Sequence, residues 1–153
     1  MPETQEPLEL RLTGRQNDFY SLVIDDAIPN TGYIGGLGSG KTVVGSAVVL
    51  TILQKYPGIR GLLVAPTFDQ LRQGSLQTFM EWCPQNYIKS HNRTEHVISF
   101  NFFDEKGNAS ELLYRSSSEI DRIRSHEYAF AWHDESAMSP EDSRMVIRGR
   151  LRH

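Results

Sequence analysis

The segment Gly35-Gly36-Leu37-Gly38-Ser39-Gly40-Lys41-Thr42 has the residue types and the spacing that bind phosphate. It matches G-x-x-x-x-G-K-[ST], a loop whose backbone N–H groups surround the phosphates of a nucleoside triphosphate. Its glycines let the chain approach phosphate oxygens without a Cβ in the way. Lys41 is placed to reach the β- and γ-phosphates, and the Thr42 hydroxyl to bind Mg²⁺. The predicted nucleotide-binding residues are Gly35, Gly36, Leu37, Gly38, Ser39, Gly40, Lys41 and Thr42.

The flanks of this segment favour a phosphate site over the alternative, an ordinary turn before an ordinary helix. Tyr33-Ile34 ends a short strand-like run, and a helix follows from Thr42. A strand before the loop and a helix after it are the context that the motif requires. The positive end of the helix would add to the attraction for phosphate.

A second group of chemically active residues stands near the end of the chain. The apolar run 128–132 is followed by His133 and then by Asp134-Glu135. This is the form of a buried strand that delivers acids to its C-terminal end, where open α/β sheets bind ligands. Asp134 would hold Mg²⁺ together with Thr42, and Glu135 would polarise the water that attacks the γ-phosphate.

The alternative interpretation makes Asp134 and Glu135 plain solvated carboxylates after a strand. The phosphate loop upstream favours the catalytic interpretation. His133 occupies a position where an apolar residue is more usual, and we interpret it as a polar side chain at a strand end rather than as a catalytic group.

The first half of the chain contains the elements that would position the loop. A capping box at 13–16 predicts a helix through Val23, and 29–32 is typical of a turn. The helix from Thr42 to about Lys55 is apolar on nearly every face, so it is expected inside the fold. The continuous apolar run 61–65 predicts a strand buried on both faces of a parallel sheet.

The second half begins with another capping box at 67–70, which opens a helix with one apolar face: Phe68, Leu71, Ser75, Phe79 and Trp82. Segments 97–102 and 111–115 flank a polar loop and predict an antiparallel hairpin. Residues 118–124 predict a helical turn. Ser139 is expected to cap a final helix, with Pro140 at its first position.

Composition limits the class of protein. The 153 residues, 39% of them hydrophobic and 23% charged, suit one soluble domain with a sizeable core. The net charge of −3 indicates no general attraction to nucleic acid or to an acidic membrane. Cys83 is the only cysteine, which fits a reducing compartment and a core position rather than a nucleophile. No apolar run is long enough to span a bilayer, and no zinc-ligand spacing is present.

Taken together, the motifs resemble those of the large terminase subunit of tailed bacteriophages. The phosphate loop and residues 132–137 resemble its ATPase motifs. Residues 15–19, 65–68 and 118–124 resemble its glutamine segment, a strand-to-helix segment and an arginine-containing segment. The resemblance runs from about Leu10 to the end of the chain, and the ordered set of motifs is what points to terminases.

The resemblance implies a RecA-like P-loop ATPase of the ASCE type: a mainly parallel sheet with flanking helices and an inserted antiparallel hairpin. It implies ATP and Mg²⁺ as cofactors, assembly as a homo-oligomeric ring at the capsid portal, and translocation of double-stranded DNA. The portal protein and the small terminase subunit would be partners, and the bacterial cytoplasm the location, without membrane contact.

Two site residues also follow from the resemblance. Gln16 corresponds to the family's adenine-contacting glutamine, with the capping box as the equally open alternative. Arg124 corresponds to an arginine that reaches a neighbouring subunit's nucleotide, where it would stabilise charge on the transferring phosphoryl group. Arg122 and Arg115 are rivals for this role, and a solvated or salt-bridged arginine is the alternative for all three.

This chain departs from the family in two respects. Leu37 stands where many terminases carry an arginine, so a phosphate contact from that position is lost. The family also continues with a coupling motif, the rest of the ATPase sheet and a nuclease domain, and none of these is present. Residues 1–153 are therefore expected to form a single, partial ATPase domain, incomplete at its C-terminus, that binds Mg·ATP but hydrolyses it weakly.

Two other functions remain open from the sequence. One is a helicase-like or other RecA-type ATPase that acts on nucleic acid. The other is a remnant that binds nucleotide or partner subunits without turnover. The arginines from 144 to 152 could line a DNA path, but a basic last helix is more often a solvated face or a subunit contact.

Overall fold

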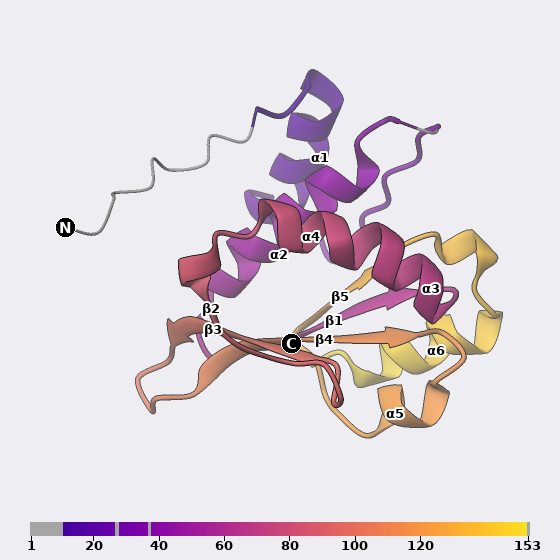
Figure 1. Cartoon of the computed structure of the whole chain (residues 1–153). Coiled ribbons are helices and arrows are strands. Elements are labelled where there is room, and N and C mark those ends of the chain that lie inside the picture. Colours follow the sequence, from indigo (N-terminus) through magenta and orange to yellow (C-terminus); the bar gives the residue numbers. More distant parts are fainter. Residues whose placement is uncertain (1–10, 27, 37, 153) are drawn as a thin grey trace.

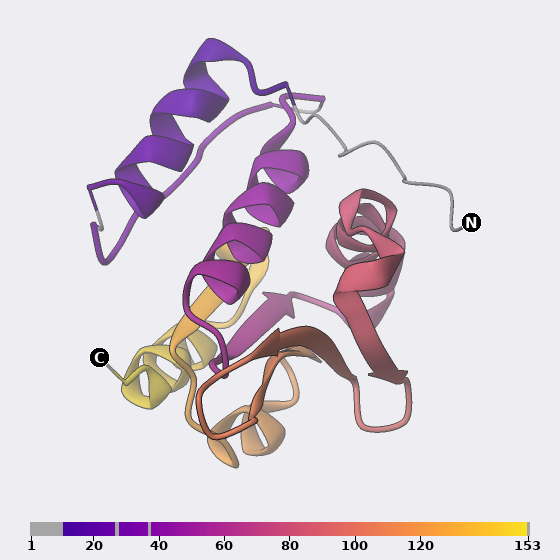
Figure 2. The ribbon, with the colours of Figure 1, turned by 90° about the vertical axis from the view of Figure 1, so that its left-hand side faces the viewer.

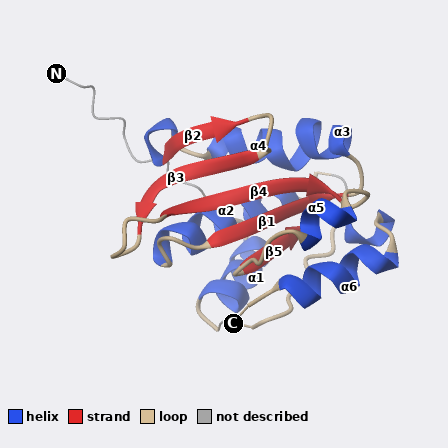
Figure 3. Cartoon of the chain, turned by 90° about the horizontal axis from the view of Figure 1, so that it is seen from below, coloured by secondary structure: helices blue, strands red, loops and turns tan. Residues whose placement is uncertain are grey.

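The computed structural model describes residues 11–26, 28–36 and 38–152, which form a five-stranded sheet with helices on both faces (Figure 1). The order of the strands is β2-β3-β4-β1-β5 (Figure 3). At the centre of the sheet, β1 pairs in parallel with β4 on one side and with β5 on the other. These three strands are β1 (Arg60–Ala65), β4 (Ala109–Ser116) and β5 (Phe130–His133).

An antiparallel extension completes the sheet. Strand β3 (Val97–Phe103) pairs antiparallel with β4, and β2 (Ile88–Asn92) pairs antiparallel with β3. The hairpin of β3 and β4 confirms the sequence prediction. No local pattern predicts β2, because its side chains are only weakly alternating and most of them are exposed.

One face of the sheet carries α2 (Lys41–Lys55) and the helical segment that follows β1, with α1 (Gly14–Ile24) packed on α2 (Figure 2). The segment after β1 comprises α3 (Phe68–Gln70), the π-helical turn η1 (Leu71–Ser75) and α4 (Leu76–Trp82). The backbone N–H of Gln70 donates to Thr67 Oγ1 at 3.2 Å, so the predicted cap is present. A short 3-10 turn, η2 (Gln85–Tyr87), leads into β2.

The larger core cluster lies between this helical layer and the sheet. Its fully buried side chains come from both layers: Val49, Leu53, Leu63, Leu71, Phe79, Ile98, Phe100 and Leu112. Cys83 belongs to the same cluster, and burial raises the pKa of its thiol to about 12. The prediction that Cys83 is a core residue rather than a nucleophile is therefore confirmed.

The opposite face carries α5 (Ile120–Arg124) and α6 (Glu141–Arg150), which enclose a smaller cluster with Leu62, Val64 and Leu113 (Figure 3). Between β5 and α6 the chain forms the 3-10 turn η3 (Ser136–Met138). Ile123 and Ile147 are the buried side chains that the two helices contribute. None of the helices in the described ranges is long and apolar enough to cross a membrane.

Three sequence predictions are wrong in detail. Residues 31–36 form no strand, and Ile34 is fully exposed. A strand needs a neighbour for its backbone groups, and among the described residues none pairs with this segment. The strand predicted at 128–132 is found at 130–133, and it is a half-buried edge strand because only β1 pairs with it. Ser139 does not cap α6, whose N-cap position is Pro140 with no side-chain cap.

Candidate active site

The phosphate loop joins residues 31–36 to the first turn of α2. Gly38 and Gly40 have φ angles of +72° and +75°, which a residue with a side chain rarely adopts. The Lys41 ammonium folds back over the loop and donates to the carbonyl of Gly35 at 2.6 Å. Leu37 lies outside the described residues, so its predicted part in nucleotide binding has no structural description.

The residues present fit a nucleotide at this loop. Ser39 Oγ is buried and has no hydrogen-bond partner among the described residues. A Cβ at Gly35 would lie 2.5 Å from the same oxygen, so this position accepts only glycine without a shift. An unpaired buried hydroxyl beside left-handed glycines at a helix N-terminus is the arrangement that receives a phosphate group.

The acid pair lies directly opposite the loop lysine. Strand β5 runs parallel to β1, and the backbone N–H of Asp134 donates to the carbonyl of Val64 at 2.8 Å, which extends the pairing past the end of β5. Glu135 Oε1 is then 3.9 Å from Lys41 Nζ, and the side chain of Glu135 is 49% exposed. A half-exposed ion pair of this length contributes about 0–1 kcal/mol to stability. The structure therefore brings Lys41 and Glu135 together without depending on their attraction.

Glu135 has an unusual backbone conformation. Its φ and ψ are 47° and 43°, in the left-handed region, and it immediately precedes η3. For a residue with a Cβ this conformation costs roughly 1–2 kcal/mol. Such strain persists where the surroundings fix the chain, and it is concentrated at functional sites. The sequence offered no signal for this feature, because glutamate does not favour a left-handed conformation.

Asp134 is the more buried acid of the pair. Its pKa is raised, chiefly by loss of hydration and also by the neighbouring Glu135, while Ser75 and Lys41 act in the opposite direction. The Ser75 hydroxyl is fully buried and faces Asp134. In the sequence Ser75 stands on the predicted apolar face of its helix, with no predicted role. A small polar residue on that apolar face was the available signal.

Thr42 and Asp134 are the predicted Mg²⁺ ligands, and both are half-buried. The described residues contain no group of three or more His, Cys, Asp or Glu side chains that could hold a metal. Mg²⁺ is commonly held by one or two carboxylates together with nucleotide phosphates and water rather than by a protein cage. One carboxylate and one hydroxyl would be enough protein ligands for Mg²⁺ that arrives with a nucleotide. That Thr42 and Asp134 supply them stays a prediction.

Gln16 contacts both the start of α1 and the phosphate loop. Its Oε1 accepts from the backbone N–H of Thr13 at 2.8 Å, and its Nε2 donates to the carbonyl of Gly40 at 3.1 Å. The capping interpretation is therefore confirmed, and the side chain also ties α1 to the loop. Contact with an adenine ring stays a prediction.

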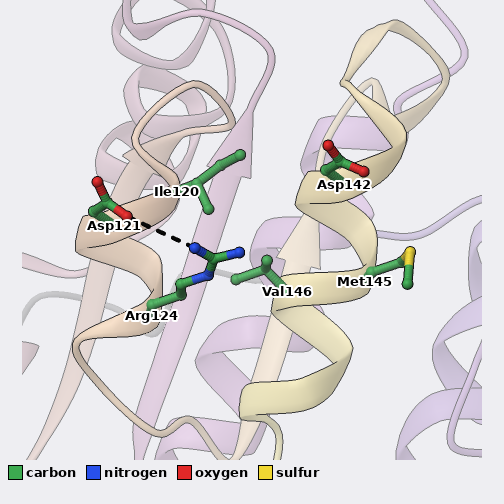
Figure 4. A pocket seen from close by; sticks show the side chains of 6 residues that line it. All are labelled: Ile120, Asp121, Arg124, Asp142, Met145 and Val146. Atoms are coloured by element: carbon green, nitrogen blue, oxygen red, sulfur yellow. Dashed lines mark ion pairs between the residues drawn. The ribbon is translucent and has the colours of Figure 1, made fainter.

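Arg124 points from α5 toward α6, across a groove of about 650 Å³ (Figure 4). Its guanidinium lies 3.8 Å from Asp121, and its side chain is 55% exposed. Its lining residues belong to α5 and α6, and these helices lie on the face of the sheet opposite α2 (Figure 3). Arg124 therefore lies on the other face of the sheet from the helix that follows its own phosphate loop. Its action on the nucleotide of another chain stays a prediction.

The two rival arginines differ in exposure. Arg122 is also exposed and lies 3.5 Å from Glu119, so it stays a rival for the trans role. Arg115 is 4% exposed and donates to the backbone carbonyls of His96 and Tyr114. A buried arginine held by its own backbone cannot reach a second chain, which removes Arg115 from the candidates.

Comparisons with known proteins show which solved structures share this fold. No protein-family model matches the sequence, and no curated protein matches it. The large terminase of a thermophilic bacteriophage superposes with a TM-score of 0.77 and 18% identity, over 94% of this chain and 37% of that one. The same terminase in complex with ADP gives a TM-score of 0.79 and 16% identity, over 92% and 36%.

The chain has the fold of a large terminase ATPase domain. A structure described as the large terminase ATPase domain of a Thermus phage also matches, with a TM-score of 0.54 and 21% identity over 75% of this chain and 53% of that one. This terminase fold is the RecA-like α/β architecture expected from the sequence. The chain spans just over a third of the length of the thermophilic phage terminase.

Proposed function

We propose that this chain is an ATP-binding and ATP-hydrolysing motor segment of a viral DNA-packaging terminase, which powers the translocation of double-stranded DNA into a capsid. The observation that carries the proposal is the meeting of two distant segments: the Lys41 ammonium and the Glu135 carboxylate are 3.9 Å apart. Its second support is the fold, which is shared with a terminase solved in complex with ADP and with ATP-γ-S.

In this proposal each residue has a separate task. The loop glycines and Ser39 cradle the phosphates, and Lys41 leaves the Gly35 carbonyl to contact the β- and γ-phosphates. Thr42 and Asp134 would hold Mg²⁺, which when bound neutralises phosphate charge. Glu135 orients and polarises the attacking water, and its half-exposed carboxylate leaves room for that water.

Assembly would complete the catalytic site. Because Arg124 lies across the sheet from its own loop, it would act on the nucleotide of an adjacent chain in a homo-oligomeric ring. The complete motor would then work at the portal with the portal protein and the small terminase subunit, in the cytoplasm of a bacterial host. An isolated chain is accordingly expected to bind Mg·ATP well and to turn it over weakly.

ATP turnover by this chain, measured with and without double-stranded DNA, tests the proposal. Mg²⁺-dependent phosphate release that increases when DNA is added supports a motor segment. Lys41→Ala should abolish both ATP binding and phosphate release. ATP binding without turnover at any chain concentration, with or without DNA, would favour a nucleotide-binding remnant. Turnover that only single-stranded nucleic acid stimulates would favour a helicase-like enzyme.

A further inference from the structure

A side-chain hydrogen bond joins the two ends of the loop that carries Asp134 and Glu135. His133 Nε2 and Ser139 Oγ lie 2.8 Å apart, and either atom can be the donor, depending on the imidazole tautomer. His133 is the last residue of β5, and Ser139 precedes Pro140 at the start of α6. The bond therefore links the strand before the acid pair to the helix after it.

One partner of this bond is buried and the other is half-buried. Ser139 is 7% exposed, and its hydroxyl is free to bond His133 because α6 has no side-chain cap. Replacement of His133 would leave the buried Ser139 hydroxyl without its side-chain partner, which is unfavourable.

The backbone of the loop is fixed at its two ends and strained in between. At the first end the N–H of Asp134 donates to Val64 at 2.8 Å. At the second end the N–H of Met138 donates to Glu135 at 3.0 Å, and that of Ser139 to Ser136 at 3.2 Å. Glu135, with its φ of +47°, lies between these anchors. Glu135 can keep this left-handed conformation only while the distance between the two ends of the loop is fixed.

Helix α6 supplies a rigid support for the Ser139 end. The Ser143 hydroxyl donates to the carbonyl of Pro140 at 2.6 Å, and Ser143 itself is fully buried. One turn later, Ile147 is 4% exposed in the smaller core cluster. The position of Ser139 is therefore set by a helix packed against the sheet, and the bond transmits that position to His133.

We propose that His133 and Ser139 are positioning residues that hold Glu135 opposite the phosphate loop. The inference rests on the proposed ATPase function, in which neither side chain touches the reacting atoms. An apolar residue is more usual where His133 stands, so the bond is a feature of this chain rather than a requirement of the motif. Its loss should impair the chemical step and spare nucleotide binding, because the phosphate loop is anchored elsewhere.

Steady-state ATP hydrolysis by four variants tests this inference. Ser139→Ala and His133→Leu should each lower kcat about tenfold, because small displacements of a catalytic group are costly, while KM for ATP stays within about twofold. His133→Gln keeps a polar group at the Nε2 position and should retain most of the activity. Ser136→Ala is the matched control, since the Ser136 hydroxyl forms no side-chain hydrogen bond in the described part of the chain.

Amide hydrogen exchange gives a second readout that needs no turnover. The amides of Met138 and Ser139 should exchange faster in Ser139→Ala and His133→Leu and remain unchanged in Ser136→Ala. The double variant His133→Leu/Ser139→Ala should be no worse than either single variant, because both remove the same bond. Additive losses, an unchanged kcat, or equal exchange in all variants would overturn the inference. A wild-type chain without turnover would overturn the proposed function, and exchange would still decide whether the bond holds the loop.

Discussion

At the scale of single residues, the two acids at the end of β5 have different environments and therefore different properties. Asp134 is half-buried with a raised pKa, whereas Glu135 reaches toward solvent beside Lys41. A bound Mg²⁺ would stabilise the ionised form of a carboxylate that has lost part of its hydration. An exposed carboxylate can instead contact the attacking water molecule. This division matches the roles assigned from the order of the two residues in the sequence.

The burial of Asp134 predicts how its neutral analogue affects stability. A raised pKa means that folding disfavours the ionised form, so ionised Asp134 lowers the free energy of unfolding at neutral pH. Asp134→Asn should therefore be more stable than the wild type at pH 7, and this advantage should shrink as the pH falls through the raised pKa. Urea unfolding over a pH series measures the difference.

Asp104 provides a control, because its pKa is shifted in the direction opposite to that of Asp134. Hydrogen bonds from Asn108 lower the pKa of this exposed carboxyl, so its ionised form is favoured by folding. Asp104→Asn should be less stable than the wild type at pH 7, with the deficit lost as the pH falls through the lowered pKa. If the stability of both variants relative to the wild type changed with pH in the same direction, burial would not destabilise the ionised form of Asp134 in the folded chain.

At the scale of elements, the distance between α2 and β5 determines whether the loop and the acids meet. Gly45 on α2 faces Trp132 on β5, and a Cβ there would lie 2.5 Å from Trp132 Cζ2. The indole side chain is large, so the helix and the strand could not accommodate a methyl group without a shift. Glycine at this position permits the close approach of the two elements that carry the site.

This contact makes Gly45→Ala a sensitive test of the packing. Overpacking of this kind costs about 1–3 kcal/mol, which should lower the midpoint of urea unfolding. Gly149→Ala in α6 is the matched control, because a Cβ there meets nothing within 4 Å. That variant should be neutral or gain up to about 1 kcal/mol from helix propensity. A Gly45→Ala chain as stable as the control would contradict the observed packing.

The elements also show how far the sequence alone could predict the fold. Helices α1 and α2, strand β1 and the hairpin of β3 and β4 have local signals, namely caps, glycines and apolar runs, and they were predicted within a few residues. Strand β2 and the absence of a strand at 31–36 depend on pairing with distant segments, which no local pattern encodes. Ser139 has the signal of a helix cap, but a half-buried histidine six residues upstream provides the partner for its hydroxyl.

The candidate site shows the same division. Lys41, Thr42, Asp134 and Glu135 were identified because their motifs are local and chemically specific. The contact of Gln16 with Gly40, the proximity of Ser75 to Asp134 and the bond between His133 and Ser139 join residues that the fold brings together. These supporting contacts required the structure, since serine and histidine occur widely without such roles.

At the scale of the whole molecule, the sheet separates the phosphate loop from the groove that contains Arg124. The phosphate loop belongs to the layer of α1 and α2, and the groove that contains Arg124 belongs to the layer of α5 and α6 (Figure 3). A nucleotide at the loop and an arginine in the groove therefore face different neighbours. This arrangement suits a head-to-tail ring, in which each chain receives an arginine from the next.

In this proposal, the effect of Arg124→Ala on ATP turnover depends on assembly. ATP binding should be unchanged, and turnover should fall at chain concentrations where the protein self-associates; trans arginines contribute on the order of a thousandfold in assembled enzymes. Arg72→Ala is the matched control, because Arg72 is also exposed and has an aspartate partner three residues upstream. Turnover by a demonstrated monomer, unaffected by Arg124→Ala, would exclude the trans role, and a loss in Arg122→Ala alone would assign the role to Arg122.

The most direct measurement of the central claim is ATP turnover by Glu135→Gln beside its affinity for Mg·ATP. If the phosphate loop and the acid pair form one catalytic site, turnover should fall by at least about a hundredfold, because the general base is lost. The dissociation constant for Mg·ATP should remain within about threefold, because the exposed Lys41–Glu135 pair contributes little to binding energy. Turnover equal to that of the wild type, or loss of binding along with turnover, would contradict a catalytic role for the acid pair at this loop.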